Sequence, residues 1–310
     1  MVHTSLARFL VVRVLSGAVV VVAVVAGTWL TLYLLRPNII DDGTPVAGQL
    51  TGYLGRVFLH FDLGTALLPG NPTVASRLRA GIPADLALLV GGVLVGTTLG
   101  VGGGALAALR PRSLAVRIGE ALAFVALASP VFVVGLGLLL LFGAHIATVP
   151  LGVGIPLEYV EWGESPAGWL GALLVPWLVL GLPLAGLCFR MMSGMTVEAL
   201  REPYVQTARA KGVGRRATVL RHAAPSALLP TLTLAGAATN TTLLNLALLE
   251  PVFGVPGVLR DLPRVVGTTD VDLLLGVTLV IAVLVVTLNI IVDVLLRALD
   301  PALRQTRTAR

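Results

Sequence analysis

Long apolar runs, separated by shorter polar stretches, dominate this chain of 310 residues. A helix needs roughly 20 apolar residues to cross a bilayer core that is ~30 Å thick. The run from Val14 to Leu35 is longer than the about 7–15 apolar residues of a secretory signal, so it predicts a retained helix. The pattern therefore predicts an all-α polytopic membrane protein with six transmembrane helices: about Leu10–Leu35, Ala84–Leu109, Ile118–Phe142, Leu170–Met192, Ala227–Leu249 and Leu273–Leu296.

Composition and charge support this interpretation and orient the helices. Hydrophobic residues make up 56% of the chain and charged residues 12%, against about 25% charged residues in soluble domains. The basic residues fall between the apolar spans, which excludes a nucleic-acid interpretation of the net charge of +6. Of the 22 Lys and Arg residues, 16 lie on the side that holds both termini. The positive-inside rule places that side in the cytoplasm, and hence predicts a multi-pass protein of the bacterial plasma (inner) membrane.

Two extracytoplasmic segments are too long to be simple turns. Arg36–Pro83 is predicted to fold as a small cap, and Glu250–Val271 as a Pro/Gly-interrupted hairpin over the outer mouth. We expect residues 1–82 to comprise the first helix with the cap segment, and residues 83–310 a five-helix core. The sequence does not indicate what the 36–82 segment does.

Small residues recur at fixed spacing in the second span. Gly92, Gly96, Gly100 and Gly104 are each four residues apart and form a flat stripe on one helix face. Such a stripe lets two helix backbones approach closely in lipid. It predicts close helix packing, either within this chain or at a moving contact between the halves of a transporter.

Polar side chains concentrate in the fifth span. Thr241 and Asn245 share one helix face, and Ala238 with Thr242 continues a narrow strip beside them. Because polar residues within a bilayer tend to face a bundle interior or a wet cavity, we interpret these four as candidates for lining a pathway. Threonine can also satisfy its hydroxyl on its own helix backbone.

The sequence carries no set of residues that suggests catalysis. Four histidines are scattered along the chain, and Cys188 is single, so it is interpreted as a buried apolar residue. The phosphate-binding pattern G-x-x-x-x-G-K-[ST] is missing, so the sequence predicts no nucleotide site of this kind on the chain. Ionisable residues lie near span ends, which disfavours a proton relay.

The longest predicted cytoplasmic loop, about 198–225, is predicted to contain two short helices. Pro203 suits the first turn of a helix, where its missing N–H costs nothing. Gly212 and Gly214 suit a helix end followed by a sharp turn. A second helix is predicted to begin near Arg215 and run toward Pro225 and the fifth span. Composition alone would also allow this basic loop to attract anionic lipid headgroups.

The order of residues in the loop resembles the EAA loop of permease subunits of ATP-binding-cassette (ABC) importers, in the form of the dipeptide and oligopeptide importer family. That pattern has Glu-Ala-Ala, three residues, a glycine, and a proline thirteen residues later. Here Gln206, Thr207 and Ala208 occupy the first positions, and Gly212 and Pro225 match. Gln206 replaces the usual glutamate, which removes the expected docking carboxylate. Segments similar to the family occur over most of the chain, including ASPVFVVGLGLLLLF and EPVFGVPGVLRD.

This resemblance implies a type I (MetI-like) importer permease bundle that is not itself an enzyme. The expected partners are a second related permease, one or two P-loop ATPase subunits that carry ATP and Mg, and an extracytoplasmic substrate-binding protein; no cofactor is expected on this chain. The ATPase would dock on a coupling helix and drive alternating access, through the residues Tyr204, Val205, Gln206, Thr207, Ala208, Arg209, Ala210, Lys211, Gly212, Gly214 and Pro225.

The resemblance implies di- or oligopeptide import, and several alternatives stay open. Members of the same family handle haem, nickel or glutathione. A stand-alone channel or an ion-coupled carrier would need no docking loop, and a membrane-bound enzyme would need a catalytic set. Neither the solute nor the identity of the partner permease follows from the sequence.

Overall fold

The computed structural model describes residues 6–35, 43–146, 159–262 and 270–299. In these ranges every regular element is a helix, and the single β pairing is an isolated bridge between Thr65 and Thr73. The all-α class predicted from the sequence is confirmed. The helices are α1 (Leu6–Leu35), α3 (Val46–Leu59), α4 (Val74–Ala107), α5 (Leu114–Ala128), α6 (Val131–Ile146), α7 (Pro166–Ala199), α8 (Pro203–Ala210), α9 (Arg215–Ala217), a π-helix η1 (Thr218–Ala223), α10 (Ala224–Phe253), a 3-10 helix η2 (Leu259–Asp261) and α12 (Val271–Leu299).

Five helices in the described residues are long and apolar enough to cross a membrane, and a bent pair would supply a sixth span. The predicted third span, Ile118–Phe142, is not one straight helix: α5 and α6 meet at a bend of 107°. Ser129 is extended (ψ 129°) because a residue that precedes proline is forced out of the helical region. Pro130 therefore ends α5 and starts a new helix in another direction.

Two of the predicted outer segments are shorter than expected because the adjoining helices are longer. Helix α4 begins at Val74, within the expected cap, and α10 continues through Pro251 to Phe253. Glu250 was expected to begin the outer hairpin, but it lies in the last turn of α10 and is fully buried. Gly254 (φ +66°) ends this helix in the left-handed conformation.

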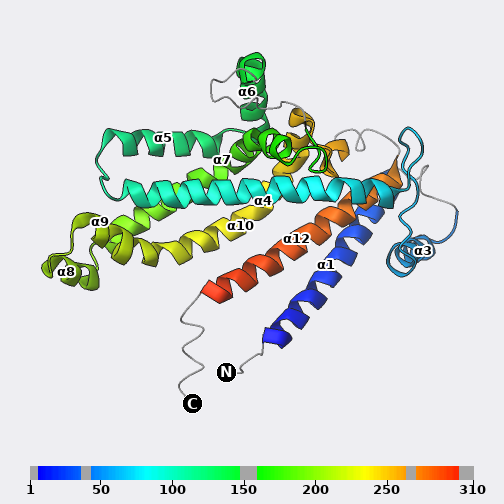
Figure 1. Ribbon diagram of the computed structural model, residues 1–310. Coiled ribbons are helices and arrows are strands. Elements are labelled where there is room, and N and C mark those ends of the chain that lie inside the picture. The colour runs from blue at the N-terminus through cyan, green and yellow to red at the C-terminus, as the bar shows by residue number, and fades with distance from the viewer. Residues whose placement is uncertain (1–5, 36–42, 147–158, 263–269, 300–310) are drawn as a thin grey trace. The chain divides into compact units, whose positions relative to one another are not determined.

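Residues Met1–Asp85 and Pro256–Ile291 group into one compact unit, in their described parts. Its core joins Val25 and Trp29 of α1, Tyr53 and Val57 of α3, and Leu275 of α12. Two of its helices, α1 and α12, are drawn in blue and in orange to red in Figure 1. The unit thus joins the first helix to a segment that is more than 200 residues away in the sequence.

The first turns of α4 hold the segment that follows α10. The guanidinium of Arg77 donates to Asp261 Oδ2 from Nε (2.9 Å) and Nη2 (2.6 Å), and Nη2 also donates to the Gly257 carbonyl (3.0 Å). Further along α4, Asp85 Oδ1 accepts a hydrogen bond from the Val258 N–H at 2.8 Å. This segment is consequently pinned by charged side chains that are themselves partly or fully buried.

The second unit contains Leu86–Val255 and Val292–Arg310, again in their described parts. Within it, the glycine stripe of α4 lies against α7. A Cβ built at Gly96 would lie 2.5 Å from the carbonyl oxygen of Gly181, and one built at Gly104 would lie 2.6 Å from that of Phe189. The same face continues at Gly92 against Leu180 and at Gly100 against Ala185 and Cys188. The stripe therefore serves packing within the chain, the first of its two interpretations.

Candidate functional site

The loop between α7 and α10 folds as two short helices and a π-helix at one end of the second unit (Figure 1). Helix α8 begins at Pro203, as predicted, and Glu202 is its N-cap residue in an extended conformation (φ −66°, ψ 143°). The carbonyl of Glu202 accepts from the N–H groups of Val205 and Gln206, both at 3.1 Å. Proline fits here because the first residues of a helix have no carbonyl to bond within it.

Gly212 ends α8 in a Schellman motif. Its φ of +81° is the left-handed conformation that glycine adopts without a side-chain clash. The N–H of Val213 bonds to the Ala208 carbonyl at 3.2 Å, and the N–H of Gly212 bonds to the Arg209 carbonyl at 2.9 Å. Gly214 differs, because its φ of −61° and ψ of 151° are open to any residue. The turn predicted for the two glycines therefore depends on the first of them.

Helix α8 has one buried face and one exposed face. Val205 (0% exposed) and Ala208 are buried, and Val205 packs with Ala199 at the end of α7 and Ala223 before α10. The other predicted docking residues of the helix are exposed: Tyr204, Gln206, Thr207, Arg209, Ala210 and Lys211, with Gly212 and Gly214 beyond it. The helix thus rests on the bundle through small apolar side chains and presents a polar, basic surface outward.

Side-chain hydrogen bonds fix the loop to its neighbours. The Tyr204 hydroxyl lies 3.3 Å from both the His222 carbonyl and Ser226 Oγ, and so joins α8 to the start of α10. Arg215 Nε donates to the Leu109 carbonyl at 2.8 Å, just beyond the end of α4. Helix α10 then begins at Ala224, three residues before the predicted start of the fifth span, and holds Pro225 in its first turn. A displacement of α8 can therefore be transmitted to α7, to α10 and to the end of α4.

Gln206 occupies the position where the docking carboxylate was expected, and its side chain turns back to its own chain. Its Nε2 donates to the Leu200 carbonyl at 3.0 Å, at the C-cap of α7. A glutamate could not make this bond because a carboxylate has no hydrogen to donate. Sequence reasoning identified the substitution but missed the contact, because the pairing depends on the angle between α7 and α8.

The four pathway candidates on α10 do not share one exposed face. Ala238 packs against the cluster of Leu184, Cys188 and Ala235, and Thr242 is buried with its hydroxyl on the Ala238 carbonyl (3.4 Å). Asn245 is partly buried, and Thr241 is exposed. Thr241 is therefore the member of the strip whose side chain is accessible in this chain.

The described residues contain no group of three or more His, Cys, Asp or Glu side chains that could hold a metal ion. His60 and His222 each contact a backbone carbonyl five residues earlier, at 3.2 and 3.3 Å. Cys188 is fully buried, as predicted.

Long apolar helices with a short, basic, exposed helix between two of them are typical of a membrane transport subunit of the permease class. A family model described as binding-protein-dependent transport system inner membrane component matches residues 100–305. The chain belongs to this family. It is therefore the permease component of an ABC importer, works with a substrate-binding protein, and leaves ATP hydrolysis to a separate ATPase subunit.

Two curated relatives cover most of the chain. The di/tripeptide transport system permease protein DppB of Pseudomonas aeruginosa is 32% identical over 279 residues, which are 85% of this chain and 82% of that protein. The D,D-dipeptide transport system permease protein DdpB of Escherichia coli, named as probable, is 30% identical over 273 residues, which are 83% of this chain and 80% of that protein. The resemblance that the sequence suggested is confirmed.

Proposed function

We propose that this chain lines the translocation pathway for dipeptides or oligopeptides, and that an ATPase drives it through α8. The observation that carries the docking proposal is the geometry of α8. The helix is seated by Val205 and Ala208 and ends in a Schellman motif at Gly212. It exposes the cations Arg209 and Lys211, so acidic side chains in a groove of the ATPase would complement it. The peptide specificity is supported by the names of the two relatives.

The assembly that we propose contains a second, related permease and one or two P-loop ATPase subunits. ATP and Mg would bind to those ATPase subunits, and this chain would carry no cofactor. Both termini would lie in the cytoplasm, since 16 of the 22 basic residues then lie inside. Closure of the ATPases would push on α8, and the permease would alternate between inward-open and outward-open states while the binding protein releases solute from outside.

An uptake experiment tests the substrate class. The chain, produced with its partner subunits and binding protein in a strain that lacks its own peptide importers, should accumulate a radiolabelled dipeptide. Unlabelled di- and oligopeptides should compete, whereas haem, nickel and glutathione should not. Competition by one of these three would reassign the substrate. Uptake that persists without the ATPase subunits would instead favour a stand-alone channel or an ion-coupled carrier.

Thr241 is the residue of α10 that we propose to line the pathway, because it is exposed between the buried Thr239 and Thr242. Thr241→Trp should reduce uptake in the same assay to a few per cent or less of the unmodified level, roughly the effect of a barrier raised by 2–3 kcal/mol. Assembly with the partners should not change. Thr241→Ala, which adds no bulk, is the matched control and should transport normally. Normal uptake by the tryptophan variant would remove Thr241 from the pathway.

A further inference from the structure

A cavity of about 640 Å³ lies in the first unit, between the end of α1, the length of α3 and the start of α12. Its apolar wall includes Trp29, Tyr53 and Leu275, which are 3%, 9% and 1% exposed and belong to the core of the unit. Gly48 and Gly52 of α3 also line it, and a Cβ added to either glycine would meet no atom within 4 Å. The apolar wall of the cavity is therefore well packed, and the absence of a Cβ at the two glycines helps to keep the cavity open.

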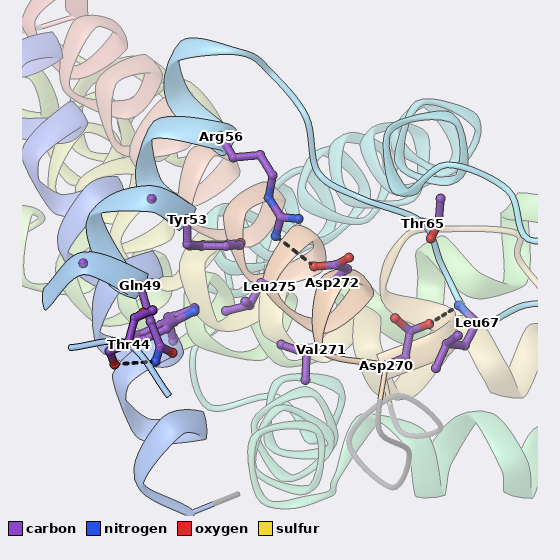
Figure 2. Close-up of a pocket in the computed structure, with 13 residues that line it drawn as sticks. Thr44, Gln49, Tyr53, Arg56, Thr65, Leu67, Asp270, Val271, Asp272 and Leu275 are labelled. Carbon is purple, nitrogen blue, oxygen red and sulfur yellow. Dashed lines mark hydrogen bonds and ion pairs between the residues drawn. The ribbon is translucent and has the colours of Figure 1, made fainter. Parts of the chain in front are cut away.

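Two opposite charges face each other in this cavity. Arg56 Nη2 lies 3.4 Å from Asp272 Oδ1, and the two side chains are 43% and 32% exposed. Figure 2 shows the guanidinium of Arg56 directed toward Asp272 with the ring of Tyr53 beside it, and its carbon Cζ is 5.5 Å from the centre of that ring. The long, partly exposed contact leaves both charges able to take up a ligand that carries the complementary pair.

The other carboxylate of the cavity has a structural role. Asp270 Oδ2 accepts from the Leu67 N–H at 2.6 Å, and Oδ1 accepts from the Leu273 N–H at 3.1 Å. The first bond holds the loop after α3 against the start of α12 (Figure 2), and the second caps the first turn of that helix. Asp272 also accepts a hydrogen bond from the backbone of Thr65, but its contact with Arg56 is long and partly exposed, so Arg56 and Asp272 form the charged pair that can respond to a ligand.

Tyr53 adds a hydrogen-bond donor. Burial, followed by the negative charge of Asp272, raises the pKa of Tyr53 to about 12, although Arg56 opposes the shift. The phenol consequently keeps its proton throughout the physiological range. Arg56 and Tyr53 can donate to an anionic group, and Asp272 can accept from an ammonium group beside it.

The cavity lies at the ends of two apolar spans. Trp29 is in the last turns of α1, and Asp272 is in the first turn of α12. Trp29 stacks on Tyr33 with ring centres 5.5 Å apart, and such aromatic residues are enriched where a membrane meets water. Leu30 and Leu34, which are 40% and 70% exposed, continue the apolar surface along the same turns of α1.

We propose that this cavity binds the headgroup of an aminophospholipid. Its phosphate contacts Arg56 and the Tyr53 hydroxyl, its ammonium group contacts Asp272, and its acyl chains follow the exposed apolar surface of α1. A free peptide carries the same two charges, but the position at the ends of two spans favours a lipid. This lipid site would be an addition to the proposed transport function, and the proposal does not depend on which solute the permease transports.

Lipid binding to the purified, delipidated full-length chain tests the proposal. Phosphatidylethanolamine, phosphatidylcholine and phosphatidylglycerol with identical acyl chains are added separately, and bound lipid is counted by native mass spectrometry. Phosphatidylethanolamine should bind about tenfold more tightly than phosphatidylcholine, because a quaternary ammonium cannot donate the charge-assisted hydrogen bond to Asp272. Phosphatidylglycerol, which has no ammonium group, should bind as weakly as phosphatidylcholine.

Matched variants separate the cavity from the general lipid surface. Gly52→Leu fills the cavity, whereas Gly55→Leu places the same side chain on the same helix at an open position that does not line it. The preference for phosphatidylethanolamine should disappear in Gly52→Leu and in Asp272→Asn, and should persist in Gly55→Leu. Equal binding of the three lipids, or an unchanged preference in both cavity variants, would overturn the proposal. Displacement of the bound lipid by a dipeptide would overturn it in favour of a solute site.

Discussion

Gly96→Leu should leave little folded protein in the membrane. The Cβ of any side chain at this position would lie 2.5 Å from the Gly181 carbonyl oxygen and 3.0 Å from the Gly181 Cα. These are backbone atoms, so no rotamer change can relieve the clash. Helix α4 would have to separate from α7, which would also open the contacts at Gly92 and Gly100. Overpacking a core costs about 1–3 kcal/mol, and we expect the upper end of that range or more.

The chain contains a close control for this prediction. Gly102 lies on the same helix, six residues further along, and a Cβ there would meet no atom within 4 Å. Gly102→Leu should therefore give normal yield and a normal unfolding temperature in detergent. If both variants purified equally well with the same unfolding temperature, the close approach of α4 and α7 would not be required for stability.

For the glycine stripe of α4, the sequence predicts the face but not the helix that packs against it. A spacing of four residues is sufficient to place the four glycines on one face, because it is close to the helical period of about 3.6 residues. It does not identify the partner, since a helix of another subunit would demand the same small residues. The reciprocal approach of Gly181, whose own Cβ would lie 2.5 Å from the Gly92 carbonyl, assigns the face to α7.

At the third span, the sequence predicted one continuous helix, whereas the structure has two helices that meet at a bend. A local signal in the sequence marks the break. The pair Ser129-Pro130 carries the information that a helix ends there, but the apolar run around it satisfies the length of a span. The direction taken by α6 after the break depends on its packing against α7 and α10, which no local rule provides. The apolar pattern thus predicted where the helices lie, but it did not predict where one of them breaks.

The charged contacts of the first unit could not be predicted from the sequence for a different reason. Arg56 and Asp272 are 216 residues apart, and Arg77 and Asp261 are 184 residues apart. Each of these side chains taken alone is an ordinary polar residue next to a span. Only the arrangement of the helices brings these residues together. The cavity, and the contacts that hold the segment after α10, therefore become visible only in the structure.

The loop between α7 and α10 was predicted most fully, because its signals are local. Pro203 at the start of α8 and Pro225 in the first turn of α10 each fix the angle φ at their own position, and Gly212 at the end of α8 permits the left-handed turn there. Gly214 was given the same weight as Gly212, but its backbone conformation is open to any residue. This difference between two nearby glycines provides the sharpest test of docking.

Gly212→Leu should abolish co-purification of the ATPase subunit while leaving the permease folded. A left-handed conformation costs a residue with a side chain roughly 1–2 kcal/mol. The chain can avoid that cost by breaking the two hydrogen bonds of the Schellman motif, which shifts Arg209 and Lys211 on the exposed face. The helical bundle should lose no more than this amount of stability, because the added Cβ meets no atom within 4 Å. Loss of docking should exceed tenfold in affinity, which corresponds to about 1.4 kcal/mol.

Gly214→Leu is the matched control, because it places the same side chain two residues away, also in open space, on a backbone with negative φ. It should bind the ATPase normally. Gly212→Asn should restore part of the binding, since asparagine tolerates the left-handed conformation better than leucine does. ATPase retained by Gly212→Leu at normal yield would exclude α8 as the docking helix. The same measurement bears on orientation, because a cytoplasmic ATPase reaches α8 only if the loop between α7 and α10 lies on the cytoplasmic side.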